Sequence, residues 1–376
     1  MPENSQTIVS PEDQSATFVE LFFDLVFVFS VTQVVSLLHH NFNWVGAGQA
    51  VLAFWLVWWA WTQFTWALNA CNTEHHLVEL GTLIATGVAF FMAVALPDAF
   101  HGHGLAFAVP YVLVRVIGLS LYSWVACENP SQRAPVRTFG FVSVGGMAAV
   151  LAGGFTSGET QYWLWGLAIL LDVIAAAVGG QVEGWNIHPE HFSERHGLFV
   201  IIALGETLIV AASGLSTATW TGDMIGVAVL TVAITCGLWW TYFPRSKPAM
   251  EHALRARSGA AQSTMARDVY SLLHFPMLCG IVAYAVAIEE AAAHPSEPLG
   301  FAGRLALALG LVLFVGGMAV AMLRAARRLL LPRVVVTAGA VCAIFLVTDV
   351  APAVTLTIGL AGVTLIAVQE QRAEDH

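Results

Sequence analysis

The chain has 376 residues, of which 57% are hydrophobic and only 11% carry a charge. A typical soluble domain carries about 25% charged residues, so this chain lacks the polar surface needed to face water on all sides. The net charge of −10, without a basic patch of useful size outside short loops, disfavours nucleic-acid binding. The composition therefore excludes a soluble protein and predicts one whose main partner is the lipid bilayer.

The N-terminal residues 1–17 contain three acidic residues and no Lys or Arg. A secretory signal begins with a basic segment followed by a short apolar stretch, so we interpret this region as a cytoplasmic tail before the first helix. The five cysteines stand singly, without a CxxC motif or a cysteine–histidine spacing typical of zinc. We interpret them as small packing residues, and predict no metal and no other cofactor.

Apolar runs long enough to cross a bilayer, which requires about 20 residues, recur along the whole chain. The predicted fold is an all-α bundle of about 12 transmembrane helices, eight within residues 18–243 and four within 269–369. A basic cytoplasmic loop is expected at 244–268 and a short tail at 370–376. Asp349 and Pro352 interrupt the last apolar run, so residues 333–369 form either two spans or one long span with a re-entrant piece. The expected helices are 18–38, 47–68, 77–96, 105–126, 137–155, 162–179, 197–215, 222–243, 269–289, 300–323, 333–350 and 352–369.

The distribution of basic residues predicts the orientation of the bundle. With a cytoplasmic N-terminus, the cytoplasmic loops and the C-terminal tail hold thirteen of the 15 Lys and Arg residues. Cytoplasmic loops of membrane proteins are enriched in Lys and Arg. We therefore predict a multi-pass membrane protein with both termini in the cytoplasm.

An internal repeat of two six-helix halves is one interpretation of the pattern. The second predicted helix contains the sequence WWAW at 58–61, and the eighth contains WWTY at 239–242. The first and seventh helices both begin with an acidic residue, Glu20 and Glu194. The alternative is that such features recur by chance in a chain rich in aromatic residues.

Glu206, Arg115, Asp172 and His274 are ionisable residues inside predicted membrane helices without a partner of opposite charge three or four residues away. Glu206 lies about 13–18 Å into its helix at a rise of about 1.5 Å per residue, and Arg115 and Asp172 are similarly deep. His274 lies about one turn into its helix, followed by Phe and Pro. Because a charge near the bilayer centre costs roughly 2.5–3.5 kcal/mol or more, such residues are candidates for function.

These charges allow a functional and a structural interpretation. In the first, Glu206 binds a proton or an ion, and Arg115 is its counter-ion or holds an anionic substrate. In the second, Arg115 forms a static ion pair with Asp172 or Glu206 that fixes the register of the helices.

Two carboxylates, Glu20 and Asp24, lie one turn apart near the start of the first helix. Carboxylates at this spacing share a face and repel one another. Acidic residues are favoured at a helix N-terminus, which accounts for Glu20. Asp24 is followed by an apolar run, so we interpret the two as a site or a gate, with Arg195 as a candidate partner.

Two longer segments resemble the signatures of the bacterial low temperature requirement A family. They are ELFFDLVFVF at 20–29, followed by Thr32 and Gln33, and ERHGLFVIIALGE at 194–206. A looser third segment is HFP at 274–276. The resemblance implies a multi-helix inner-membrane protein associated by name with growth in the cold, and it adds His196 to the candidate residues. It implies no reaction.

Three functions compete at this point. A secondary transporter or exchanger for a small molecule or ion fits a twelve-helix bundle with deep charges and no motif for ATP binding. An integral-membrane enzyme acting on a lipid or isoprenoid would use Glu20, Asp24, Glu194, Arg195 and His196 at the membrane surface. A non-catalytic, stress-related membrane protein would use the charges for packing alone. We favour the transporter and expect no enzymatic activity.

Overall fold

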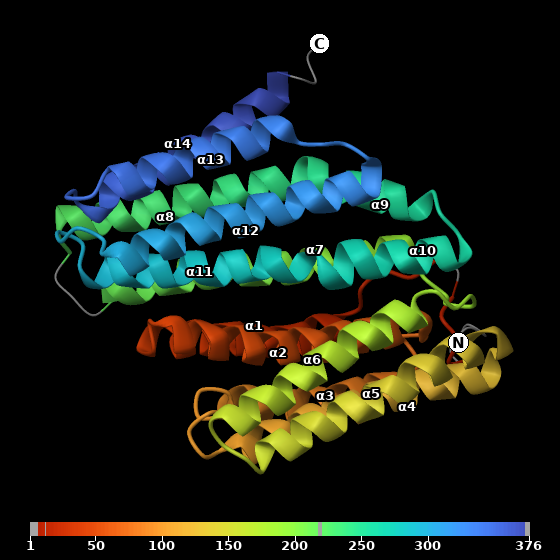
Figure 1. The fold of residues 1–376 in the computed structure, drawn as a ribbon. Coiled ribbons are helices and arrows are strands. Elements are labelled where there is room, and N and C mark those ends of the chain that lie inside the picture. The colour runs from red at the N-terminus through yellow and green to blue at the C-terminus, as the bar shows by residue number, and fades with distance from the viewer. Residues whose placement is uncertain (1–6, 12, 217–219, 373–376) are drawn as a thin grey trace. The chain divides into compact units, whose positions relative to one another are not determined.

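The computed structural model describes residues 7–11, 13–216 and 220–372, and within these ranges the chain is almost entirely helical (Figure 1). Helices satisfy every internal backbone hydrogen bond locally, which the interior of a bilayer requires. The α-helices are α1 (Phe18–His40), α2 (Trp44–Ala70), α3 (His76–Ala95), α4 (Gly104–Glu128), α5 (Arg133–Gly154), α6 (Glu159–Gly179), α7 (Pro189–Ser216), α8 (Gly222–Thr241), α9 (Lys247–Arg255), α10 (Gly259–Met265), α11 (His274–Ala293), α12 (Phe301–Ala326), α13 (Leu331–Leu346) and α14 (Pro352–Arg372).

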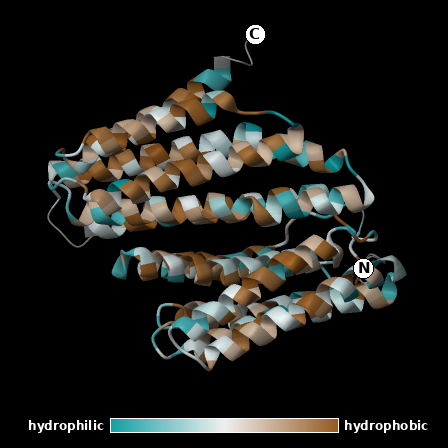
Figure 2. Cartoon of the chain, in the orientation of Figure 1, coloured by the Kyte–Doolittle hydropathy of each residue, from teal (hydrophilic) through white to brown (hydrophobic). Residues whose placement is uncertain are grey.

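The predicted all-α membrane bundle is confirmed. Eleven helical stretches of the described chain are long and apolar enough to cross a membrane. Figure 2 shows hydrophobic residues along the helices and hydrophilic residues mostly at their ends and connections. The twelfth apolar helix, α13, has 16 residues, or about 24 Å at 1.5 Å per residue. It is a separate helix from α14, because the chain leaves helical geometry at Val347.

The segment 244–268, expected to be a loop, is largely helical. The π-helical segment η3 (Tyr242–Ser246) continues α8 into α9, and η4 (Ala266–Leu272) joins α10 to α11. Helix α9 is amphipathic: Met250 and Leu254 are buried while Arg255 is exposed. Its low mean hydropathy therefore reflects a solvated face and not an irregular backbone.

Helix α7 also differs from its prediction, because it begins at Pro189 and not near residue 197. Its first two turns are polar, which hides them from a search for apolar runs. His191 and Arg195 in these turns are fully buried. The additional turns thus lie within the protein, where other side chains supply their polar partners.

Contacts divide the chain into two compact units. Unit one comprises Met1–Leu37, Trp44–His196 and Leu254–Ser271, and unit two comprises Leu38–Asn43, Gly197–Ala253 and Leu272–His376. In unit one α2 packs on α4, α3 on α4, and α5 on both α4 and α6. In unit two α11 packs on α12, α8 on α14, and α13 on α12 and α14.

The two aromatic segments behind the proposed repeat occupy different environments. Trp58, Trp59 and Trp61 of α2 are buried, whereas Trp239 and Trp240 of α8 are 40% and 44% exposed. The repeat therefore remains a prediction, and this pair of segments does not support it.

Candidate functional site

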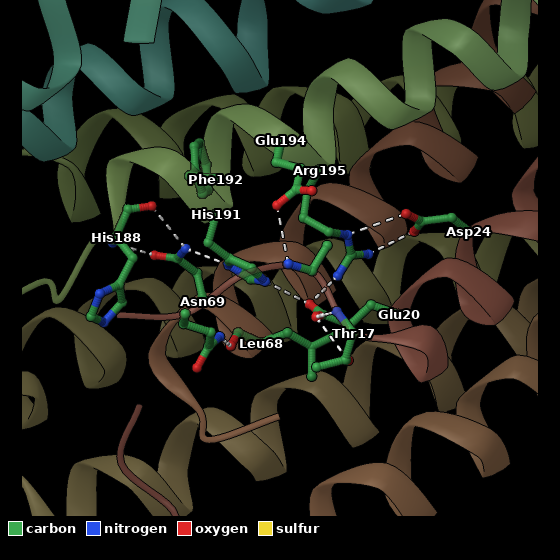
Figure 3. Close-up of polar contacts among 12 residues, drawn as sticks. Thr17, Glu20, Asp24, Leu68, Asn69, His188, His191, Phe192, Glu194 and Arg195 are labelled. Carbon is green, nitrogen blue, oxygen red and sulfur yellow. Dashed lines mark hydrogen bonds and ion pairs between the residues drawn. The ribbon is translucent and has the colours of Figure 1, made fainter. Parts of the chain in front are cut away.

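Unit one contains a buried cluster of ionisable side chains from α1 and α7, which we call the α1–α7 cluster (Figure 3). Its members are Glu20 and Asp24 of α1 and His191 and Arg195 of α7. All four residues have 0% exposure. The carboxylates one turn apart, interpreted above as a site or gate, thus face the candidate partner Arg195.

Local sequence sets the position of Glu20. Thr17 precedes α1, and its backbone N–H and its hydroxyl both donate to Glu20 Oε2, at 2.9 and 3.0 Å. The carboxylate three residues into a helix therefore reaches back to the capping position, as in a capping box. Asp24 follows one turn later on the same face.

Arg195 joins the two carboxylates. Its Nη1 donates to Glu20 Oε1, and its Nη2 and Nε donate to Asp24 Oδ1 at 2.6 Å and Oδ2 at 3.2 Å. Trp61 of α2 donates from its indole nitrogen to Asp24 Oδ1 at 2.7 Å, and its ring lies 5.7 Å from the guanidinium carbon. The bidentate contact is the strong geometry for an arginine–carboxylate pair.

The hydrogen bonds of His191 fix its tautomer. The backbone N–H of His188 donates to Asn69 Oδ1 at 2.9 Å, so the amide of Asn69 is oriented with its Nδ2 as donor. That Nδ2 lies 2.8 Å from His191 Nδ1, which must then accept. His191 Nε2 lies 2.9 Å from Glu20 Oε1, a carboxylate oxygen that accepts. This set of hydrogen bonds matches the tautomer of His191 that has its proton on Nε2 and an acceptor at Nδ1.

This tautomer leaves the cluster unbalanced in charge. Glu20 and Asp24 are two carboxylates, Arg195 is one cation, and His191 adds none. The contacts described for both carboxylates come from N–H and O–H donors, which is the arrangement that suits the ionised form. With both ionised, the cluster holds one negative charge in excess.

Two further candidates from the second family-like segment, Glu194 and His196, lie next to this cluster. Glu194 Oε2 accepts from the backbone N–H of Ala16 at 3.1 Å. His196 is fully buried, with Nδ1 2.8 Å from the carbonyl oxygen of Phe192. Four aromatic rings surround His196 with ring centroids 4.6–5.8 Å away, those of Trp58, Trp61, Phe192 and Tyr270.

Sequence reasoning missed His191 and Asn69 as members of the site. His191 lies one turn before Arg195 on the same helix face, and that spacing is a signal that was available. Asn69 carries no such signal, because it comes from the end of α2 and meets His191 only in the folded chain.

A second buried ion pair lies elsewhere in unit one. Arg115 of α4 donates from Nη1 to Asp172 Oδ1 of α6 at 3.1 Å and to Tyr111 Oη at 2.5 Å. Its Nε donates to Gln63 Oε1 of α2. Arg115 Nη2 and Asp172 Oδ2 are buried without a hydrogen-bond partner among the described residues. Of the two partners considered for Arg115, Asp172 is the one that it contacts.

Glu206 and His274 belong to unit two, and both are buried. His274 Nε2 lies 2.8 Å from Tyr242 Oη. In the described chain, no group of three or more His, Cys, Asp or Glu side chains has the arrangement to hold a metal ion.

The fold and these buried residues together define a multi-pass α-helical membrane protein with ionisable side chains inside its membrane helices. The family model of the bacterial low temperature requirement A protein (LtrA) matches residues 15–368. The chain is also 30% identical to an uncharacterised protein of Rhizobium meliloti (strain 1021) over 316 residues, which cover 81% of this chain and 76% of that protein. No solved structure matches. The chain belongs to the bacterial low temperature requirement A family.

Proposed function

We propose that this protein is a secondary transporter or exchanger of the bacterial inner membrane, with both termini in the cytoplasm. It couples the movement of a small molecule or ion to the protonation of buried carboxylates. The observation that carries this proposal is that two fully buried carboxylates, Glu20 and Asp24, share one arginine, Arg195, while the hydrogen bonds of His191 match a tautomer without charge. A charge inside a membrane helix costs roughly 2.5–3.5 kcal/mol or more. An uncompensated charge would therefore destabilise the protein if its only role were packing.

The geometry of Asp24 supplies a way to couple protonation to a change of conformation. Its described contacts come from the N–H groups of Arg195 and Trp61. A proton on Asp24 removes the negative charge that attracts Arg195. It also places an O–H donor where a carboxylate oxygen now accepts hydrogen bonds from the N–H groups of Arg195 and Trp61. Proton uptake therefore weakens the connection of α1 to α7, and proton release restores it, which is the kind of two-state element that coupling requires.

The surface-enzyme alternative receives less support from the geometry. Glu20, Asp24, Arg195 and His196 have 0% exposure, and only Glu194 is partly exposed. A lipid substrate approaching from the membrane surface would not meet these groups. The non-catalytic alternative differs from a transporter in having no proton-dependent charge movement, which an experiment can measure.

The test is a pH jump on proteoliposomes adsorbed to a solid-supported membrane, which detects proton binding before any substrate is known. We expect a transient charge displacement with the wild type and its loss in Asp24→Asn. Glu251→Gln is the matched control, because Glu251 is a carboxylate of α9 outside the cluster that pairs with Lys247 at 3.3 Å. An unchanged displacement in Asp24→Asn would remove the cluster from the mechanism.

Glu206→Gln is the second variant, because Glu206 is the buried carboxylate of unit two. Loss of the displacement in this variant, with retention in Asp24→Asn, would assign the proton to unit two. Absence of any displacement in the wild type would favour the non-catalytic alternative. A panel of small solutes added to the responding proteoliposomes then identifies the transported molecule by the current that it evokes.

A further inference from the structure

Unit one contains a cavity of about 30 Å³ beside α2. A cavity needs about 10–15 Å³ to hold one water molecule, so this one has room for about two. Much of its wall is aromatic, with Trp59 and Trp66 of α2, Tyr122 of α4, Phe139 of α5 and Trp185 of the α6–α7 connection. An aromatic wall alone would favour a dry cavity.

Polar groups in the same wall argue against a dry cavity. Thr62 and Tyr122 line it and are 2% and 1% exposed. Their hydroxyl oxygens have no hydrogen-bond partner among the described residues. A buried hydroxyl without a partner costs about 1–3 kcal/mol, and water in a polar cavity of sufficient size removes this cost. Ser271 and Gln63 add further polar atoms to the wall.

The inner side of the cavity is one side chain away from the second ion pair. Gln63 lines the cavity and holds Arg115 at both ends of its amide, because Oε1 accepts from Nε and Nε2 donates to the carbonyl oxygen at 2.9 Å. Trp59 also lines the cavity, and its indole nitrogen lies near Asp172 but outside hydrogen-bonding geometry. Both residues therefore separate the cavity from the Arg115–Asp172 pair.

The rim of the cavity is more open than its interior. Phe139, Trp185 and Arg267 line it and are only partly buried. Arg267 donates to Asp268 at 2.5 Å and to the carbonyl oxygens at the end of α6. Because its charge is already compensated, the rim does not select an anion.

We propose that this cavity is a hydrated vestibule that brings water and water-sized polar solutes up to Gln63, which is the barrier between the vestibule and the Arg115–Asp172 pair. Arg115 Nη2 and Asp172 Oδ2 have no hydrogen bond of good geometry among the described residues, although the indole groups of Trp55 and Trp59 lie near Asp172. They are the groups that a solute would meet behind Gln63. Water in the vestibule also brings protons within one side chain, that of Gln63, of the Arg115–Asp172 pair. This inference concerns a different group of residues from the α1–α7 cluster and holds whether or not that cluster binds a proton.

Accessibility to a small thiol reagent tests the hydration. In a full-length variant with the five native cysteines replaced by alanine, we compare Thr62→Cys with Thr65→Cys. Both threonines lie on α2, are buried to a similar degree and have hydroxyls without a partner in the described chain, but only Thr62 lines the vestibule. We expect hydrogen peroxide, a thiol oxidant close to water in size, to modify Cys at 62 at least about tenfold faster, because thiol oxidation depends on access. Equal rates at the two positions, slow or fast, overturn the proposal.

A second measurement uses the wild-type protein and needs no folding of variants. Hydroxyl radicals generated by X-rays modify buried side chains that adjoin bound water. Tyr122 and Tyr284 are each 1% exposed, but only Tyr122 lines the vestibule, while the hydroxyl of Tyr284 donates to the carbonyl oxygen of Thr231 at 3.0 Å. We expect faster modification of Tyr122, and equal protection of the two tyrosines contradicts a hydrated vestibule.

The role of Gln63 as the barrier is tested in the same assay. Tyr111 contacts Arg115 behind Gln63, so Gln63→Ala is expected to raise the radical modification of Tyr111. Gln49→Ala is the matched control, because Gln49 is also a buried glutamine of α2 but is bonded to Tyr162 at 2.8 Å. No rise in Gln63→Ala, or an equal rise in both variants, refutes the connection between vestibule and ion pair.

Discussion

The charge count of the α1–α7 cluster predicts an asymmetry between two substitutions that break the same contact. Arg195→Gln and Asp24→Asn both remove the ion pair of Arg195 with Asp24. The first leaves two buried carboxylates without a cation. The second leaves Glu20 with Arg195, one charge of each sign.

The expected magnitudes follow from what each substitution leaves behind. Removing one partner of a buried ion pair costs about 3–5 kcal/mol, because the remaining charge is uncompensated, and Arg195→Gln leaves two such charges. In Asp24→Asn the amide oxygen still accepts from Trp61 Nε1 and Arg195 Nη2, as Oδ1 does now. The amide nitrogen replaces Oδ2, whose bond to Arg195 Nε is the longer one at 3.2 Å. The cost is then about 1–3 kcal/mol, that of one unsatisfied buried group.

Reversible unfolding in mixed micelles with increasing dodecyl sulfate measures both free energies of unfolding. Arg195→Lys is an informative third variant, because lysine keeps the positive charge but lacks the planar guanidinium group that contacts both carboxylates. We expect the order of stability to be wild type, Asp24→Asn, Arg195→Lys and Arg195→Gln. Equal destabilisation by Asp24→Asn and Arg195→Gln would show that the cluster carries no excess negative charge and would refute the neutral tautomer of His191.

Three further predictions concern packing and orientation. Gly184 has φ of +109°, and a Cβ there would lie 2.1 Å from the carbonyl oxygen of Ser131, so Gly184→Ala is expected to lower the unfolding free energy by more than about 1 kcal/mol in the same micelle assay. A Cβ on Gly280 would lie 2.7 Å from the backbone nitrogen of Phe314, whereas one on Gly316 meets nothing within 4 Å. Thermal unfolding should therefore show an unfolding free energy lower by about 1–3 kcal/mol for Gly280→Ala and little changed for Gly316→Ala. Cys127 is exposed at the end of α4, which faces the cytoplasm if the N-terminus does. An impermeant maleimide should then label Cys127 in inverted vesicles and not in intact cells. The reverse labelling pattern would contradict the predicted topology.

The membrane helices were predictable because their signal is a property of each segment alone. A helix that spans a bilayer needs about 20 apolar residues, and that requirement can be read from α3 or α12 without reference to the rest of the chain. The prediction failed where helices are polar for a reason outside the segment. Helix α9 has a solvated face, and the first turns of α7 are polar because they contact Glu20 and Asp24.

The candidate site was only partly predictable for the same reason. The cost of burial identified Asp24 and Arg115 as residues that need partners, and Arg195 was the partner considered for the first of them. Hydrophobicity does not say which helices meet. The contribution of Asn69 depends on the fold. The backbone N–H of His188, in the α6–α7 connection, orients the amide of Asn69, and that amide in turn orients His191.

The two ion pairs of unit one differ in a way that separates their roles. Each of the four carboxylate oxygens of Glu20 and Asp24 accepts at least one hydrogen bond within the described chain. The Arg115–Asp172 pair keeps one N–H and one oxygen without partners in the described chain and lies behind the vestibule. In the proposed mechanism, the α1–α7 cluster binds the proton and the Arg115–Asp172 pair receives the solute. Coupling between them requires a shared helix, and α2 provides it, since Trp61 contacts Asp24 while Gln63, two residues later, holds Arg115.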